Sequence, residues 1–193
     1  MRFGSQLCGS CLAAIVFAMA APLAMAADTY KVDPVHSSVV FRIKHLDVSY
    51  SYGRFNNPTG TVVWDAADPT KSSVNVEIKT ENVDTDNQKR DDHLRGPDFF
   101  DVKQFPTITF KSTAVKAVGE NKFDVTGNLT LHGVTKSITI SLGKTGEAQT
   151  QMGYRAGWET AFKIKRSDYG MTGMVGPVGD EVELYVSIEG GKQ

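Results

Sequence analysis

Apolar and polar side chains alternate along most of the chain after residue 27. In residues 37–46, Phe41 and Ile43 share one parity, and Arg42 and Lys44 share the other. Alternation with a period of two is typical of β-strands that bury one face and expose the other. Because the pattern recurs in roughly eight segments, the sequence predicts an all-β fold.

The parity of each segment also predicts which side chains face the interior. Inward-facing positions on a strand recur every second residue, and here they are aliphatic or aromatic almost throughout. Any molecule held inside such a fold should therefore be apolar. The side chains predicted to face inward and line the interior are Phe41, Ile43, Val76, Phe110, Val125, Leu129, Ile140, Trp158, Phe162 and Leu184.

Turn-forming residues separate the strands. Asn57–Gly60, Asp68-Pro69 and His132-Gly133 are short enough to join antiparallel neighbours as hairpins. Such strands can form a two-sheet sandwich or a closed barrel. An eight-stranded barrel is either filled by its own side chains or holds one ligand, and parity alone does not separate the two.

Two segments depart from the alternation. Residues 84–105 are charged and interrupted by Pro97, which predicts a short helical segment near 86–101 across one end of the barrel. Residues 170–179 carry glycine at every third position and predict a flexible surface loop.

The first residues are typical of a secretory signal peptide. Arg2 follows the initiator, residues 12–19 are apolar, and Ala24-Met25-Ala26 provides a signal-peptidase site. The apolar run is shorter than the roughly 20 residues of a membrane span. We therefore expect cleavage of residues 1–26, a single exported domain at 27–193, a periplasmic location and no transmembrane span in the mature protein.

Composition narrows the possible chemistry. Both cysteines, Cys8 and Cys11, precede the cleavage site, so the mature protein should have no disulfide or thiol chemistry. Loss of Arg2 lowers the 21 basic residues to 20, against 22 acidic ones. This near-balance argues against a nucleic-acid partner, which requires a basic face.

The sequence contains no recognisable catalytic or metal-binding motif. It has no nucleophile elbow, no phosphate-binding loop and no dinucleotide fingerprint, so no catalytic residue is predicted. The four histidines lack the spacing of a metal site, and no metal is predicted. Only a metal site assembled from separate strands stays open.

Four polar residues are candidates for the polar end of a ligand. His45 ends an apolar strand face and is either a core histidine or a ligand contact at the rim. Arg90 and His93 lie in the charged segment, where they either bind a head group or only cap the barrel. Arg166 shares the inward parity of its strand.

An inward charge is unfavourable unless it is paired. Arg166 therefore requires a partner, which could be the carboxylate of Asp168 or Asp91 or the oxygen atoms of a ligand. A salt bridge that closes the barrel and a contact to a ligand both remain open for Arg166.

Several motifs together resemble one family, the YceI-like periplasmic polyisoprenoid-binding proteins. The matching stretches run in order through residues 28–190 and include Asp33-x-x-His36-Ser37, Gly53-x-Phe55, Arg90-Asp91-x-His93-Leu94, Gly127-x-Leu129-Thr130-Leu131 and Arg166-x-Asp168-Tyr169-Gly170. The resemblance implies an extended, eight-stranded antiparallel lipocalin-like barrel. It also implies an apolar tunnel for a long isoprenoid such as a prenyl quinone or prenyl diphosphate, frequent homodimers, and no established catalytic activity.

The leading expectation is therefore a periplasmic carrier of a polyisoprenoid, with the lipid as its only bound group and no other cofactor. Each CH₂ group buried from water contributes roughly 0.8 kcal/mol, which suits binding of an insoluble chain. Two alternatives stay open: an isoprenoid-processing enzyme, and a stress-related or structural protein whose barrel is filled.

Overall fold

Burial alternates along the strands in the way that the hydrophobic pattern predicts. A computed structural model describes Met1 and residues 27–193 of the protein. The predicted signal peptide, apart from Met1, lies outside the described residues, as do Cys8 and Cys11. In β8 (Lys122–Leu131) every second residue from Phe123 to Leu131 is buried. The all-β prediction is confirmed for this range.

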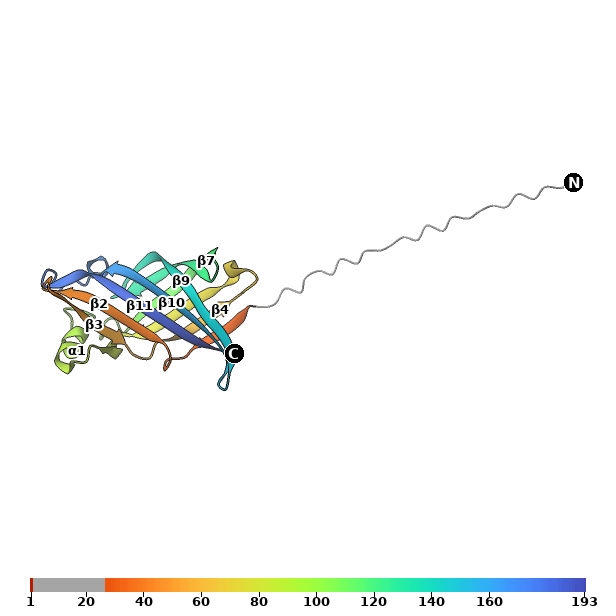
Figure 1. Ribbon diagram of the computed structural model, residues 1–193. Coiled ribbons are helices and arrows are strands. Elements are labelled where there is room, and N and C mark those ends of the chain that lie inside the picture. Colours follow the sequence, from red (N-terminus) through yellow and green to blue (C-terminus); the bar gives the residue numbers. More distant parts are fainter. Residues whose placement is uncertain (2–26) are drawn as a thin grey trace.

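The strands form one antiparallel sheet in the order β1-β4-β5-β7-β8-β9-β10-β11-β2-β3-β6 (Figure 1). Their bounds are β1 Asp28–Val32, β2 Ser38–His45, β3 Ser49–Phe55, β4 Thr59–Trp64, β5 Ser73–Lys79, β6 Val83–Asp84, β7 Thr107–Gly119, β8 Lys122–Leu131, β9 Val134–Thr150, β10 Gly153–Lys165 and β11 Val178–Lys192.

The sheet closes on itself through β11. Its residues Val182–Ser187 pair with β2, and its later residues Gly190–Lys192 pair with β1. The successive pairs β1 and β2, β3 and β4, and β5 and β6 thus act as three interrupted strands of an eight-stranded antiparallel barrel. The predicted closed barrel is confirmed, and the sandwich alternative is wrong.

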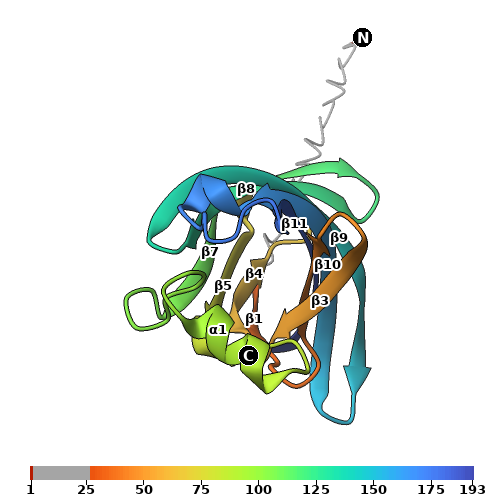
Figure 2. The ribbon, with the colours of Figure 1, turned by 90° about the vertical axis from the view of Figure 1, so that its left-hand side faces the viewer.

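The helical segment lies at one end of the barrel. Figure 2 looks onto this end, where α1 (Gln88–Arg95) crosses the rim on the side of β3 and η3 (Arg166–Tyr169) lies opposite. The Asn87 side chain accepts a hydrogen bond from the Arg90 amide over 3.0 Å and caps the helix. The helix falls within the predicted 86–101 and ends at Arg95, since Pro97 disfavours a helical conformation at the residue before it.

Two further short 3₁₀ turns are η1 (Pro69–Lys71) and η2 (Thr80–Asn82). None of the helices within the described residues is both long and apolar enough to cross a bilayer.

The end opposite α1 is filled by large aromatic side chains. Tyr30 and Trp158 meet edge to face with ring centroids 5.3 Å apart, and Trp64 and Phe123 do so at 4.6 Å. Trp158 also lies 5.8 Å from Trp64, so the four rings form one connected group, here called the aromatic plug. A second apolar cluster, including Val39, lies nearer α1.

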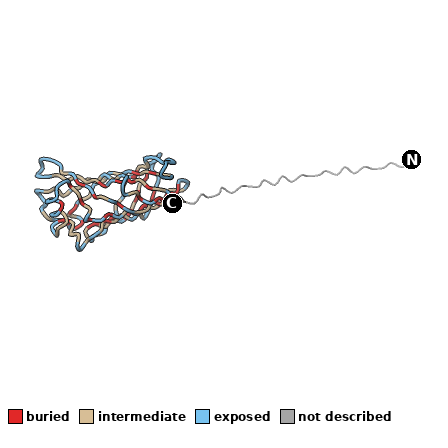
Figure 3. Tube along the Cα trace, turned by 90° about the horizontal axis from the view of Figure 1, so that it is seen from below, coloured by how far each residue is buried: buried red, intermediate tan, exposed pale blue. Residues whose placement is uncertain are grey.

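The loops contain many of the exposed residues. Exposed loops are most evident at the end of the barrel away from the C-terminus (Figure 3). Buried and exposed positions alternate between the two ends, as expected for a barrel wall with one face inward.

Replacement of Trp158 by alanine should lower the free energy of unfolding by about 3–5 kcal/mol, because the indole is 2% exposed and packed among other rings. Its N–H has no hydrogen-bond partner among the described residues, so the loss comes from packing. Phe162, on the same strand but bordering a cavity, serves as the comparison. Urea denaturation should show a clearly smaller loss for Phe162→Ala, and equal losses would contradict a filled plug.

Candidate functional site

Three apolar cavities run in series from the α1 end toward the aromatic plug. The mouth cavity has a volume of about 220 Å³, the middle cavity about 120 Å³ and the deep cavity about 90 Å³. The mouth and middle cavities share Phe41, Ile43, Leu94, Phe99 and Val178 in their linings, and the middle and deep cavities share Val39, Ile78, Ile108, Leu129 and Leu184. The cavities therefore adjoin one another along the barrel and are together called the tunnel.

The tunnel wall is apolar over most of its length. Arg166 is the one charged residue in the lining of the middle cavity, and Thr160 is the one polar residue in that of the deep cavity. Polar side chains gather only in the mouth cavity, where His45, Arg90 and His93 take part in the lining. The tunnel is thus suited to a molecule with a long apolar body and a polar end.

The residues predicted to line the interior divide into two groups. Eight of them border at least one cavity: Phe41, Ile43, Val76, Phe110, Leu129, Ile140, Phe162 and Leu184. Val125 and Trp158 border none of the three. Both lie in the core cluster around the aromatic plug, where large rings fill the interior of the barrel.

Two glycines explain how the tunnel stays hollow. A Cβ at Gly127 would lie 2.5 Å from the Phe110 ring, and a Cβ at Gly53 would collide with the Phe41 ring. Each phenylalanine therefore lies over an inward-facing glycine of the adjacent strand. Because the rings rest against the barrel wall, they take up less of the interior than they would beside larger neighbours.

Arg90 is held at the mouth by hydrogen bonds to Thr85, the residue that follows β6. Its Nε donates to the Thr85 hydroxyl over 2.7 Å, and its Nη2 donates to the Thr85 carbonyl oxygen over 2.6 Å. The buried Asp91 carboxylate accepts from the Thr85 amide over 2.9 Å and from its hydroxyl over 2.5 Å. Thr85 thus fixes α1 against the barrel, a role that its residue type did not reveal in the sequence.

The two histidines at the mouth are accessible to solvent. His93 pairs with Asp98, with Nε2 3.2 Å from Oδ2, and packs edge to face on Phe99 at 5.0 Å. His45 ends β2 and is exposed at the rim. Arg90, His45 and His93 all border the mouth cavity and are the candidates for binding the polar end of a ligand.

Arg166 lies apart from this group and is 3% exposed. Its guanidinium donates to four backbone carbonyl oxygens: Gly179 at 2.8 Å, Met171 at 3.0 Å, Gly173 at 2.7 Å and Val178 at 3.0 Å. Four of the five N–H groups of an arginine side chain are thus occupied.

The prediction that Asp168 or Asp91 could pair with Arg166 is wrong. Asp168 pairs instead with Lys136 at 3.5 Å, and Asp91 accepts from Thr85. Burial lowers the pKa of Arg166, and the nearby Asp180 charge acts in the opposite direction. The bonds from Ser167 lower the pKa of Asp180.

The same contacts correct the expectation of a flexible loop at residues 170–179. Its carbonyl oxygens converge on one guanidinium, and at Gly173 a Cβ would collide with the Asp98 carbonyl oxygen. The loop is therefore fixed against the segment that follows α1. Carbonyl groups carry no signature in the sequence, so this role of Arg166 could not be derived from spacing.

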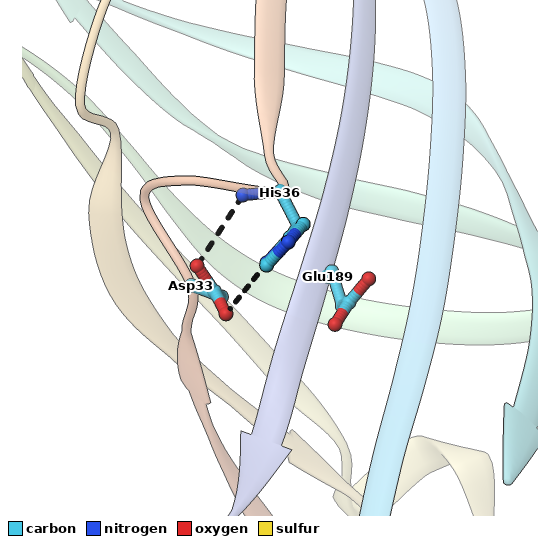
Figure 4. Close-up of side chains that lie close together, drawn as sticks. All are labelled: Asp33, His36 and Glu189. Carbon is cyan, nitrogen blue, oxygen red and sulfur yellow. Dashed lines mark hydrogen bonds and ion pairs between the residues drawn. The ribbon is translucent and has the colours of Figure 1, made fainter. Parts of the chain in front are cut away.

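A separate polar cluster lies where β1 and β2 meet β11 (Figure 4). Asp33, His36 and Glu189 place their ligand atoms within 4.8 Å of one another, the type of set that could hold a metal ion. Arg155 already pairs with Asp33 at 2.8 Å and lies 3.7 Å from Glu189. Because a fixed cation neutralises both carboxylates, the cluster is better explained as an ion-pair network that closes the barrel.

The geometry defines the class to which the protein belongs: an elongated eight-stranded antiparallel barrel with an apolar tunnel that opens at one end. The YceI-like domain family model matches residues 30–190, nearly the whole described barrel. The chain therefore belongs to the YceI-like family, as the sequence motifs indicated.

Relatives and solved structures agree with this assignment. A UPF0312 protein of Pseudomonas aeruginosa is 47% identical over 173 residues, which cover 88% of this chain and 90% of the relative. The crystal structure of BcnA from Burkholderia cenocepacia superposes with a TM-score of 0.75 at 26% identity and covers 82% of this chain and 98% of its own.

A polyisoprenoid-binding domain from Saccharophagus degradans, implicated in plant cell wall breakdown, has the same fold. Its TM-score is 0.69 at 20% identity, and the match covers 85% of this chain and 98% of that domain. At this identity the similarity concerns the architecture of the barrel.

Acidification should weaken the barrel closure through Asp33. A hydrogen bond from His36 is the main cause that holds the pKa of Asp33 well below its ordinary value, and the Val35 amide and Arg155 add to it. Because the folded-state pKa lies below the unfolded value of about 3.9, the stabilisation is fully present above about pH 4 and is lost as the pH falls through the folded-state pKa.

The measurement compares urea unfolding of the wild type and Asp33→Asn across this range. The stability difference between them should be largest near neutral pH and should shrink below about pH 4. Asp86→Asn, at an exposed position before α1 whose carboxylate has no ion pair or hydrogen bond within the described residues, provides the comparison. A difference between wild type and Asp33→Asn that does not change with pH would contradict the role of the Asp33 carboxylate.

Proposed function

We propose that this protein binds and carries a long polyisoprenoid lipid in its tunnel. The observation that carries the proposal is the series of three linked cavities, apolar except at the mouth. The architecture shared with a domain described as polyisoprenoid-binding supports the same ligand class. The signal-like N-terminus supports export and a periplasmic location for this activity.

The energetics of the tunnel favour a chain-like ligand. An isoprenoid is poorly soluble in water, and each CH₂ group that leaves water contributes roughly 0.8 kcal/mol. Ordering a flexible chain offsets part of this gain. Leu129 and Leu184 line both the middle and the deep cavity, so a thin chain passing between the two would displace these side chains less than a wide ring system.

Binding, rather than catalysis, is the activity that the tunnel lining supports. The described residues around the middle and deep cavities are aliphatic and aromatic except for Arg166 and Thr160, and Arg166 is occupied by backbone carbonyls. The Thr160 hydroxyl donates to the Ser141 carbonyl oxygen and is not paired with a base that would make it a nucleophile. We therefore favour a carrier over an isoprenoid-processing enzyme.

The ligand should lie with its tail toward the aromatic plug and its polar end at the mouth. Of the three cavities, the mouth cavity has the most polar side chains in its lining, and Arg90 there keeps one terminal NH₂ group without a hydrogen bond in the described residues. A head group with oxygen atoms can accept hydrogen bonds from Arg90 and His93. Arg166, in contrast, is proposed to act on the loop and not on the ligand.

Filling the tunnel should abolish lipid binding without unfolding the barrel. Leu184 borders both the middle and the deep cavity, so Leu184→Trp should block passage of the chain and reduce the bound lipid at least about tenfold. Ser187→Trp places the same indole side chain on the exposed outer face of the same strand, and this variant should bind lipid like the wild type.

Lipid extraction of the purified proteins, followed by mass spectrometry, measures this difference, and circular dichroism checks the fold. Absence of any extracted isoprenoid from the wild type, together with no uptake of added prenol, would favour the alternative of a barrel without ligand.

Loss of Arg90 should discriminate between ligand head groups. Arg90→Ala should weaken binding of a prenyl diphosphate by about tenfold or more, since a charge-assisted hydrogen bond is worth about 1.5–3 kcal/mol, and should change binding of a neutral prenyl quinone little. Lys89→Ala removes an exposed charge from the same helix and serves as the control.

Fluorescence competition with both lipids gives the affinities. Melting temperatures show how far the loss of the hydrogen bonds to Thr85 destabilises the Arg90→Ala variant. Equal weakening for both ligands would place the polar end of the lipid elsewhere.

A further inference from the structure

Apolar side chains gather on the outside of the barrel beside the mouth cavity. Leu46 and Val48, in the turn between β2 and β3, are 58% and 82% exposed. Met174 and Val175, in the loop after η3, are 51% and 48% exposed. These four residues are here called the apolar tip. The Leu46 amide donates to the Pro177 carbonyl oxygen over 2.8 Å, so the turn and the loop are joined.

The backbone holds two of these side chains in an unfavourable conformation. Leu46 has a φ of 52° and Met174 a φ of 53°, in the left-handed region that glycine and asparagine adopt more readily. Turns elsewhere in the chain place the favoured types at such positions, including Asn57 and Asn121. Bulky apolar residues at strained, exposed positions indicate that the side chains have a use outside the folded barrel.

Aromatic and basic side chains lie directly behind the tip. Tyr50 and Tyr52, both on β3, are 49% and 55% exposed, and Tyr52 also borders the mouth cavity. The Lys44 ammonium lies 4.7 Å from the centre of the Tyr50 ring, and the Arg42 guanidinium lies 4.5 Å from it. Tyrosine and lysine in this position, behind an aliphatic tip, are typical of groups that rest at the boundary between a bilayer and water.

From this arrangement we propose that the apolar tip inserts into the surface of a lipid bilayer and brings the tunnel mouth to the membrane. The proposal rests on the proposed function, because an isoprenoid dissolves in a bilayer and not in water. Met174 belongs to both the tip and the mouth-cavity lining, so the inserted surface is continuous with the tunnel. Asp47 lies within the same turn, and its exposed carboxylate would be repelled by anionic lipids. The proposed contact is therefore made by the apolar side chains and does not depend on anionic lipids.

Flotation with neutral phosphatidylcholine vesicles tests the docking. The double variant Leu46→Asn/Val48→Ser removes two apolar side chains that border none of the three cavities. Asparagine tolerates a positive φ, so the turn is retained and the melting temperature should not fall. Vesicle binding should weaken by about tenfold or more, while uptake of prenol from detergent micelles stays at the wild-type level.

A matched control changes exposed apolar residues at the other end of the barrel. Val118, near the end of β7, and Met152, in the turn between β9 and β10, are 50% and 58% exposed. Val118→Ser/Met152→Gln should float with vesicles as the wild type does. Wild-type flotation should also be similar at low and high salt, since the insertion is apolar.

The outcomes separate the two proposals. A wild type that takes up prenol from micelles but never floats would overturn the docking and assign the tip to a protein partner, with the proposed function intact. Equal loss of flotation in both double variants would also overturn it, as unspecific adsorption. A wild type that floats, loses flotation only through the tip variant and takes up no prenol would support docking and contradict the proposed carrier.

Discussion

The barrel depends on a single strand, β11, that has two successive neighbours on one edge. Val182–Ser187 hold β2, Gly190–Lys192 hold β1, and the other edge pairs with β10 throughout residues 181–191. If the last residues of β11 were removed, β1 would lose one of its two neighbouring strands, and the sheet would open at the plug end. The Asp33 and Arg155 ion pair joins β10 to the junction of β1 and β2, so polar contacts support the closure where the strand is interrupted.

Closure alone does not produce a tunnel, because an eight-stranded barrel has an interior that side chains can fill. At the plug end, four rings from four different strands do fill it. Toward α1, inward-facing Gly53 and Gly127 let phenylalanine rings lie along the wall. The filled end supplies the stability of packed aromatic surface, and the walls of the hollow part are formed by side chains of both apolar clusters.

The hydrophobic pattern predicted the strands and their inward faces because a period of two leaves little freedom in side-chain direction. It could not separate Phe162, which borders a cavity, from Trp158, which lies in the plug, since both have the same parity. That difference depends on the size of the partners across the barrel. Arg166 was recognised as an inward charge, but its partners are carbonyl groups of a distant loop, which no residue type encodes.

The two ends of the barrel are stabilised by different interactions, and this difference bears on how a lipid could enter. Aromatic packing at the plug cannot be opened without loss of the core. At the mouth, α1 and the loop after η3 are held by hydrogen bonds to Thr85 and Arg166 and by the packing of Leu94 and Met171, and none of these contacts belongs to the pairing of the strands. Segments outside the paired core strands open locally at lower free energy than those strands. Exchange of a ligand is therefore expected at the mouth, the end where the polar residues and the apolar tip also lie.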